Sequence, residues 1–325
     1  MSQVREIPET LLTRPFTRDQ ARELGVSKAM LAGRRFVRIH PRVWRHRDHV
    51  MSWWDEVQAG VLALPATARL THVTRIQQLG LEFGPRRPLH FVVEGELHLA
   101  LDGIFLHRTK GLAPTDDIGV VPSAAFVAYC STARLIDAII VGDWLLRQDH
   151  MTVPQLVALA LAAPWRDGAD EALFVLEWLD GRSRSPKESE LRAILRASGL
   201  PRAEPNRPID LHGDATAIGD LVYVHFGLVV EFEGGHHQED RAQYVADIER
   251  FSLLRDHGVP YLQVTRESLA RPRTLVGTVY RKLLALGYDG PAPEFGVGWR
   301  SLYRPVRELL PPRRTRLREL AAGRR

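Results

Sequence analysis

Hydrophobic and polar positions alternate most clearly in the C-terminal third of the chain. Ser185, Pro186 and Glu188 open a segment with helical spacing that Gly199 ends, which is the pattern of a capped helix. The segments that follow have the two-residue period of strands or the amphipathic period of helices. In order, they are a strand at 206–213, a hairpin at 218–234 that turns near Phe226 and Gly227, a helix at 239–258, a strand at 259–265 and a helix at 274–287. The predicted order is therefore αβββαβα.

The first fifty residues predict a small helical unit followed by a hairpin. Thr17 caps one helix, which Gly25 ends, and Ser27 begins a second helix that closes at Gly33. Residues 35–47 then alternate apolar and basic side chains around a His-Pro pair, as a β-hairpin wing would. This is the pattern of a winged helix-turn-helix, in which the second helix enters the major groove of DNA and the wing contacts phosphates. A three-helix scaffold without a ligand is the alternative.

The middle of the chain, residues 51–178, mixes helical and strand patterns without a visible catalytic constellation. His72, His90 and His98 are scattered along it, and each is interpreted as a surface or core histidine rather than a ligand. The polar, turn-rich stretch at 180–189 then marks a boundary. We therefore expect the middle of the chain to connect and position its two ends.

Charge is distributed unevenly along the 325 residues. The net charge is +5, but residues 34–47 hold six arginines and no acid, and residues 299–325 hold nine arginines and two glutamates. Clustered arginine suits a polyanion such as nucleic acid. An ordinary solvated surface is the alternative for the first cluster, and a disordered basic terminus for the second.

Cysteine content and apolar segments favour a cytoplasmic protein. The chain has a single cysteine, Cys130, which excludes an intramolecular disulfide and a cysteine-rich metal site. Polar and charged residues follow Met1, where a secretory leader would have an apolar core. The most apolar segment, 135–146, is interrupted by Asp137 and Asp143, so we expect no membrane-spanning helix.

The predicted hairpin carries acids where an ordinary buried strand would not. Glu231 and Glu233 are two residues apart and should point to one face, and the turn near 226–227 should place Asp220 opposite them. Carboxylates that close repel one another unless a cation compensates them. The pattern therefore predicts a site for Mg²⁺ (or Mn²⁺), which prefers oxygen ligands and activates water for phosphodiester hydrolysis. Glu188 of the preceding helix could complete this site, or could simply be the third residue of a capping box with Ser185.

Residues 183–288 resemble the PD-(D/E)XK nuclease superfamily, and more narrowly the bacterial domains related to the very-short-patch-repair endonuclease. The similar stretches are SPKESELR, GDLVYV, LVVEFEGGHH and VADIERFSLLRDHGVPYLQVT. The resemblance implies an αβββαβ core in which Glu188 is the helix acid and Asp220 and Glu231 are the metal ligands. His237 matches the histidine that usually follows this acidic motif.

Two further features qualify that resemblance. Asp247 and Arg250 match a recurrent D-X-X-R pattern, although residues at this spacing also form simple helix ion pairs. The lysine of the superfamily pattern is replaced by Glu233. Some restriction nucleases of the superfamily carry a carboxylate there, so the general base is expected to be Glu233 or His237.

The N-terminal two-thirds has a second, more diffuse resemblance, to the AbiEi antitoxin family. The stretches PFTRDQARELGVSKAMLAGRRFVRIHPRVW and ARLTHVTRIQQLGLEF are similar to it. The resemblance implies a winged helix joined to an α/β domain, autoregulation of a promoter and a cognate toxin partner. It supplies an alternative function, an antitoxin or transcriptional repressor with a catalytically silent nuclease fold.

The sequence therefore predicts a multi-domain α/β protein that binds double-stranded DNA and carries a Mg²⁺-dependent endonuclease. The predicted domains are a winged helix-turn-helix at 1–50, an α/β connecting domain at 51–180, a restriction-endonuclease-like αβββαβ domain at 181–292 and a basic tail at 293–325. The candidate catalytic residues are Glu188, Asp220, Glu231, Glu233 and His237. The residues expected to contact DNA are Ser27, Lys28, Arg34, Arg35, Arg38, Arg42 and Arg45.

Overall fold

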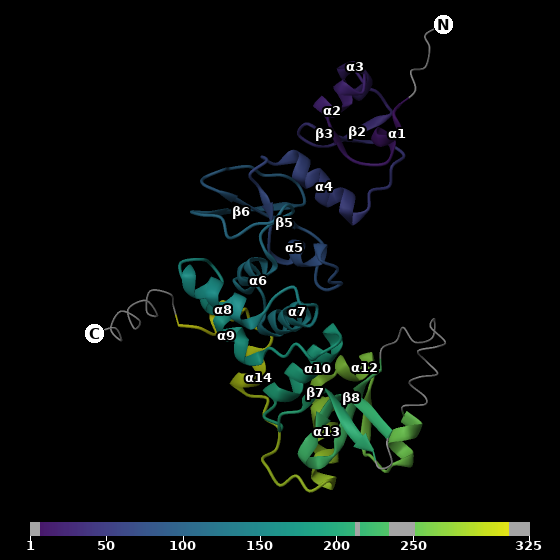
Figure 1. Ribbon diagram of the computed structural model, residues 1–325, viewed down its shortest axis with the longest axis vertical. Helices are drawn as coiled ribbons and strands as arrows, with labels where there is room; N and C mark the ends of the chain where they lie inside the picture. The colour runs from purple at the N-terminus through teal and green to yellow at the C-terminus, as the bar shows by residue number, and fades with distance from the viewer. Residues whose placement is uncertain (1–6, 212–214, 234–250, 312–325) are drawn as a thin grey trace, which may run out of the picture. The chain divides into compact units, whose positions relative to one another are not determined.

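A computed structural model describes residues 7–211, 215–233 and 251–311 of the chain (Figure 1). The chain divides into two compact units: unit 1 is Met1–Ala125 and unit 2 is Phe126–Arg325. Both units contain helices and β-sheet, with two three-stranded sheets in the first and a four-stranded sheet in the second, so the predicted mixed α/β class is confirmed. The division falls inside the segment 51–180 that the sequence predicts as one domain. Within the described residues, no helix is long and apolar enough to cross a membrane.

The first part of unit 1 joins three short helices to a three-stranded sheet. Thr17 forms a capping box with Gln20, since each side chain accepts the other residue's backbone N–H, at 3.2 and 2.8 Å. Gly25, with a φ of 79°, ends that helical turn. The sheet is antiparallel, in the order β1-β3-β2. The elements are α1 (Glu9–Leu12), β1 (Phe16–Thr17), α2 (Arg18–Glu23), α3 (Lys28–Leu31), β2 (Phe36–His40) and β3 (Val43–His46).

The second part of unit 1 is built around another three-stranded sheet, in the order β4-β5-β6. Strand β4 pairs antiparallel with β5, whereas β5 and β6 are parallel although only residues 95–103 separate them. Phe91 of β5 and Val57 of α4 belong to its buried core. The elements are α4 (Trp53–Ala63), β4 (Arg69–Leu70), α5 (His72–Gln78), β5 (Leu89–Glu94) and β6 (Ile104–Thr109).

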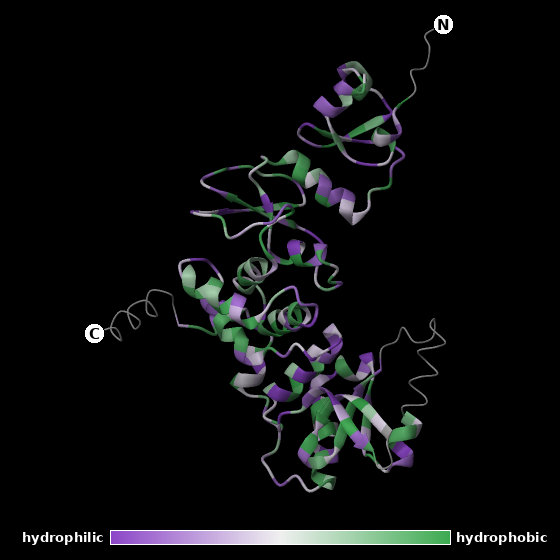
Figure 2. Cartoon of the chain, in the orientation of Figure 1, coloured by the Kyte–Doolittle hydropathy of each residue, from purple (hydrophilic) through white to green (hydrophobic). Residues whose placement is uncertain are grey.

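Helices form the first part of unit 2, and hydrophobic residues are concentrated on them (Figure 2). They are α6 (Pro122–Cys130), which spans the division between the units, α7 (Leu135–Arg147), α8 (Val153–Ala162), α9 (Ala169–Val175), η1 (Leu176–Trp178), α14 (Val297–Ser301) and η3 (Val306–Glu308). The chain returns here after the C-terminal sheet: Leu135 N–H donates to Arg304 O at 3.0 Å, and Val306 N–H to Ala133 O at 2.9 Å. Trp299 is buried. Residues 297–308, predicted as the start of a tail, are therefore folded into unit 2.

The rest of unit 2 contains a four-stranded sheet in the order β10-β9-β8-β7. Strands β7, β8 and β9 form an antiparallel meander, and β10 lies parallel to β9. The β8–β9 turn passes through η2 (Val224–Phe226) and Gly227, whose φ of 64° suits glycine, so the predicted turn is confirmed. Residues 251–256 are helical and precede β10. The other elements are α10 (Pro186–Ala197), β7 (Glu204–Leu211), β8 (Ala215–Tyr223), β9 (Leu228–Phe232), β10 (Tyr261–Val264), α12 (Arg266–Leu269) and α13 (Pro272–Ala285).

A buried ion pair joins the two parts of unit 2. Arg192 of α10 donates to Asp143 of α7 at 2.7 Å, and the two side chains are 5% and 0% exposed. The same guanidinium nitrogen donates to Trp178 O at 2.7 Å, while Asp143 also accepts the Asp180 N–H at 2.7 Å. Burial raises the pKa of Asp143, and Arg192 opposes that rise. The carboxylate is therefore held in the core by one cation, one backbone donor and the side chain of Ser189.

Removal of this cation should destabilise unit 2. Arg192→Met leaves Asp143 buried without its partner, and we expect the free energy of unfolding to fall by about 3–5 kcal/mol at pH 7. Without Arg192 the folded-state pKa of Asp143 rises further above its unfolded value, so the loss should shrink as the pH falls through that higher pKa. Urea unfolding at pH 7 and at pH 5 measures both effects.

The matched control for that experiment is Lys187→Met on the same helix. Lys187 is half exposed and pairs with Glu190 at 2.7 Å, so its loss should cost less than about 1 kcal/mol. Equal stability of the Arg192 and Lys187 variants would contradict a structural role for the buried pair.

Candidate functional site

The β8–β9 hairpin brings two of the predicted acids together. Its register pairs Leu221 with Val230, which places Asp220 and Glu231 at the next facing positions. The Asp220 N–H donates to Glu231 Oε1 at 3.3 Å, and the Phe232 N–H donates to Asp220 Oδ2 at 2.9 Å. Each acid is therefore oriented by the backbone of the opposite strand.

The two glutamates of β9 have opposite environments. Glu231 is 0% exposed, because β9 is an inner strand between β8 and β10. Glu233 lies just beyond the end of β9 and is exposed, although its N–H still donates to Val264 O of β10 at 2.8 Å. Asp220 is half-buried. The hairpin therefore offers one buried acid, one half-buried acid and one exposed acid.

Glu188, the predicted helix acid, has structural partners. It is buried near the start of α10, where its N–H donates to Ser185 Oγ at 3.2 Å. Its Oε2 accepts the Arg184 N–H at 2.8 Å and the Asn206 side-chain amide at 2.7 Å. The capping box considered from the sequence is thus half present, since the carboxylate accepts from Arg184 instead of Ser185. Helix α10 also contacts β8 and β9.

The structure does not test every member of the predicted site. His237, Asp247 and Arg250 lie outside the described residues. Within the described ranges, the predicted acids do not form a group of three or more whose ligand atoms all lie within 4.8 Å of one another. Backbone hydrogen bonds across the hairpin bring two of the predicted acids together, Asp220 and Glu231.

The predicted DNA-contacting residues fall into two groups: six that are exposed, and one whose side chain is bonded within the fold. Ser27 caps α3 by accepting the Met30 N–H at 3.3 Å, and its side chain and that of Lys28 are exposed. Four more of the predicted residues are exposed, in the β2–β3 hairpin and the segment before it: Arg34, Arg35, Arg38 and Arg42. In the part of the chain that the structure describes, only Arg42 of these four forms an ion pair, with Asp19 at 2.9 Å.

Arg45 forms the second group, because its guanidinium is hydrogen-bonded to the backbone. Its side chain is half-buried, and its Nη1 donates to the carbonyl oxygens of His46, Arg47 and His49 at 2.7–2.9 Å. These bonds hold the chain after β3. Arg45 therefore has a structural role that its position in a basic hairpin did not predict.

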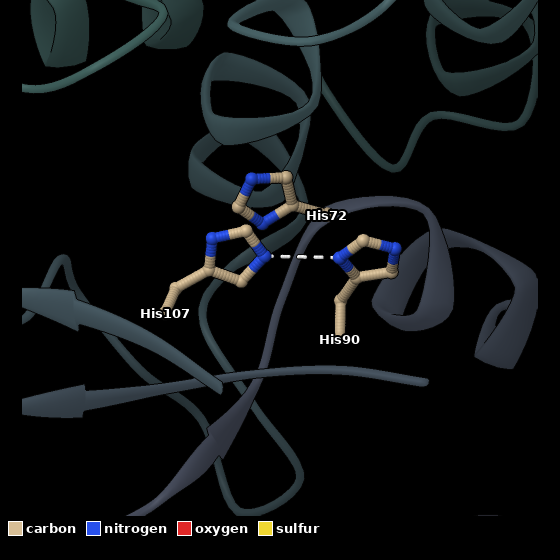
Figure 3. Close-up of side chains that lie close together, drawn as sticks. All are labelled: His72, His90 and His107. Atoms are coloured by element: carbon tan, nitrogen blue, oxygen red, sulfur yellow. Dashed lines mark hydrogen bonds between the residues drawn. The ribbon is translucent and has the colours of Figure 1, made fainter. Parts of the chain in front are cut away.

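Three histidines of unit 1 that are distant in sequence converge in space (Figure 3). His72 begins α5, His90 lies on β5 and His107 on β6, and each offers a ring nitrogen within 4.8 Å of the others. His90 Nδ1 and His107 Nε2 are 2.9 Å apart, and the His72 and His107 rings stack with centroids 3.8 Å apart. Among the described residues, this is the one group of three or more histidine, cysteine or acidic side chains that could hold a metal ion.

The environment keeps these imidazoles neutral. Burial lowers the pKa of His72 well below its usual value, and His107 and His90 add to that effect. Burial also lowers the pKa of His90, and burial together with His90 lowers the pKa of His107 to about 4. Neutral imidazole is the form that accepts protons and binds metals.

His72 is buried, as expected of a core histidine, but the sequence did not indicate that it lies close to His90 and His107. The three histidines are separated by 18 and 17 residues, which is no recognised ligand spacing. The parallel pairing of β5 with β6 brings His90 and His107 together, and no local pattern indicates it. His98, the third histidine considered from the sequence, is exposed and contacts Arg108.

Two proteins of Mycobacterium tuberculosis are similar to this chain, Rv2248 of strain ATCC 25618 / H37Rv and MT2308 of strain CDC 1551 / Oshkosh, both named as uncharacterized proteins. Each is 24% identical over 199 residues, which span 58% of this chain and 73% of the relative. No protein-family model matches the chain. The function therefore has to be inferred from the residues themselves.

The contacts of Glu188 lead to a prediction about stability. Glu188→Ala leaves the Arg184 N–H and the Asn206 amide without their acceptor, so the free energy of unfolding should fall by about 1–3 kcal/mol. Glu188→Gln keeps an oxygen at the position of Oε2 and should stay within about 1 kcal/mol of wild type. Urea unfolding of both variants, with Glu190→Ala as a control on the same helix, measures the difference. An Ala variant as stable as wild type would contradict the structural role of this carboxylate.

Proposed function

We propose that the chain is a DNA-binding protein with a C-terminal, Mg²⁺-dependent endonuclease domain. The observation that carries the proposal is the pair Asp220 and Glu231, held side by side on two neighbouring strands by backbone N–H donors. Helix α10, three antiparallel strands, the helical residues 251–256 and the parallel strand β10 follow one another in the order that the resemblance to the PD-(D/E)XK superfamily implies.

The donor chemistry of this pair fits a hard divalent cation. Carboxylate oxygens are the ligands that Mg²⁺ prefers, and one fully buried acid beside a half-buried acid gives an ion partial access to solvent. Asp220 and Glu231 would hold the ion, which supplies charge for a phosphate oxygen and acidity for a bound water. Glu233, exposed at the end of β9, would accept a proton from that water if it serves as the base.

The N-terminal elements support delivery of this domain to DNA. Their order, α1-β1-α2-α3-β2-β3 with sheet order β1-β3-β2, is the one that the proposed winged helix-turn-helix requires. The exposed Ser27 and Lys28 at the start of α3 would face the major groove, and Arg35 and Arg38 would contact phosphates.

One observation favours a second function, a repressor or antitoxin whose nuclease fold is silent. Glu231 is fully buried, and the described acids do not gather three ligands around one point. In that case the winged helix would be the functional domain, and a cognate toxin would be the partner that the antitoxin resemblance implies. Both functions require DNA binding, and they differ in whether the protein cleaves DNA.

Cleavage distinguishes the two functions. Wild-type protein should nick plasmid DNA when Mg²⁺ or Mn²⁺ is added, and Glu231→Gln should reduce nicking by about two orders of magnitude or more, because a metal-activated water contributes several kcal/mol. Glu190→Gln removes one carboxylate from α10 outside the hairpin and should leave the rate unchanged. Supercoiled-plasmid nicking assays measure all three proteins.

Each variant in that assay must match wild type in circular dichroism and DNA affinity. Absence of metal-dependent nicking by wild type would favour the silent repressor. Equal nicking by wild type and Glu231→Gln would show that the activity comes from another site or from a contaminant.

The wing can be tested separately by the dependence of DNA affinity on salt. Arg35→Gln combined with Arg38→Gln should reduce the slope of log affinity against log salt by roughly one unit for each lost phosphate contact. Arg108→Gln combined with Lys110→Gln, at exposed positions on or beside β6, removes the same charge and is the matched control. A slope that changes equally in both double variants would exclude the hairpin as the DNA interface.

A further inference from the structure

The fold of unit 1 holds His72, His90 and His107 on one side of the β4-β5-β6 sheet. Val92 of β5 pairs with His107 of β6, and side chains two residues apart share a face, so His90 and His107 point to the same side. The Thr71 N–H donates to His90 O at 3.1 Å, and the His90 N–H donates to Thr74 Oγ1 at 2.8 Å. These bonds fix the start of α5, and with it His72, against β5.

His72 is held in an unfavourable backbone conformation. Its φ is 50°, in the left-handed region that most side chains avoid, and it is only 6% exposed. Residues in such conformations cluster at functional sites, where the surrounding structure compensates for the strain. His72 Nδ1 lies 3.3 Å from Thr71 Oγ1, which leaves Nε2 as the nitrogen available to a ligand.

We propose that His72, His90 and His107 form a binding site for one transition-metal dication of the zinc class. Two nitrogens bound to the same zinc at about 2.0–2.1 Å in tetrahedral geometry are roughly 3.3 Å apart. His90 Nδ1 and His107 Nε2 are already 2.9 Å apart, so a small separation of these rings makes room for the ion. Three protein ligands leave the fourth position open for water or a small ligand.

Binding requires one ring to turn. The His72 and His107 rings are nearly parallel, 13° apart, and the lone pair of a ring nitrogen lies in the plane of its ring. We expect the His72 ring to rotate about its side-chain bonds, so that Nε2 is directed toward the His90–His107 pair. The stacked arrangement is therefore that of the metal-free cluster.

The ligand atoms determine which class of metal ion the site binds. Imidazole nitrogen suits Zn²⁺, Cu²⁺, Ni²⁺ and Fe²⁺, whereas Mg²⁺ prefers oxygen. The histidine site and the carboxylates of unit 2 should thus bind different ions. The proposed metal site does not depend on the proposed nuclease activity.

Cobalt is the probe for this site, because Co²⁺ replaces zinc in such sites and is coloured. The full chain, carrying no histidine tag and stripped with a chelator, is titrated with Co²⁺ in the presence of excess Mg²⁺, and Zn²⁺ is then added as competitor. We expect one equivalent of Co²⁺ to bind and Zn²⁺ to displace it. His90→Gln and His107→Gln should each weaken binding by more than the roughly 10–100-fold that loss of an outer-shell partner costs.

The matched control is His98→Gln, which changes an exposed histidine in the segment between β5 and β6 and should leave Co²⁺ affinity unchanged. A second measurement uses only the wild type and so does not depend on the folding of any variant. Diethylpyrocarbonate modification, mapped by mass spectrometry, should be slowed by Zn²⁺ at His72, His90 and His107 but not at His98.

Two results would overturn the site. One is a wild-type chain that binds less than one equivalent of Co²⁺ or Zn²⁺ at micromolar concentration. The other is Co²⁺ binding whose affinity is unchanged in both the His90 and the His107 variants.

Discussion

The buried ion pair between Asp143 and Arg192 is the interaction on which the arrangement of unit 2 depends. Asp143 is completely buried, so its charge requires the guanidinium of Arg192, the Asp180 N–H and the side chain of Ser189. Arg192 lies one turn after Glu188 on α10, and this helix contacts the two strands that carry Asp220 and Glu231. One electrostatic contact therefore fixes the helix against α7 and, through the helix, the sheet that holds the candidate acids.

Features encoded within a few residues could be predicted from the sequence. Thr17 and Ser185 cap helices as expected, because a hydroxyl at the end of a helix accepts a backbone N–H that has no helical partner. The β8–β9 turn falls at Gly227, where a positive φ is required. The approach of Asp220 to Glu231 follows from that turn and the two-residue period of strands. Local sequence was therefore sufficient for this half of the candidate site.

Features that depend on contacts between distant segments could not be predicted in the same way. The parallel pairing of β5 with β6 has no signature in either strand, and it alone brings His90 beside His107. Residues 297–308 have a basic composition typical of a tail, yet Trp299 and Leu302 find apolar surface in unit 2 and become buried. In both cases the partner is supplied by another part of the fold. Arg45 differs, because its three carbonyl acceptors belong to His46, Arg47 and His49, and only the path of the chain after β3 brings them to its side chain.

The burial of Glu231 bears on both proposed functions, because a buried carboxylate needs a partner that compensates its charge. Strand β9 is flanked by β8 and β10, and its neighbours Val229 and Val230 are completely buried. An apolar side chain of similar size would be as stable at this position or more so, because transfer of a charge from water to the interior costs several kcal/mol before any partner compensates it. Glu233, two residues later, lies beyond the strand and is exposed at little cost. An acid at 231 therefore needs compensation that an acid at 233 does not: in the proposed nuclease a metal ion would supply it, whereas in a silent fold protein donors such as the Asp220 N–H would supply it.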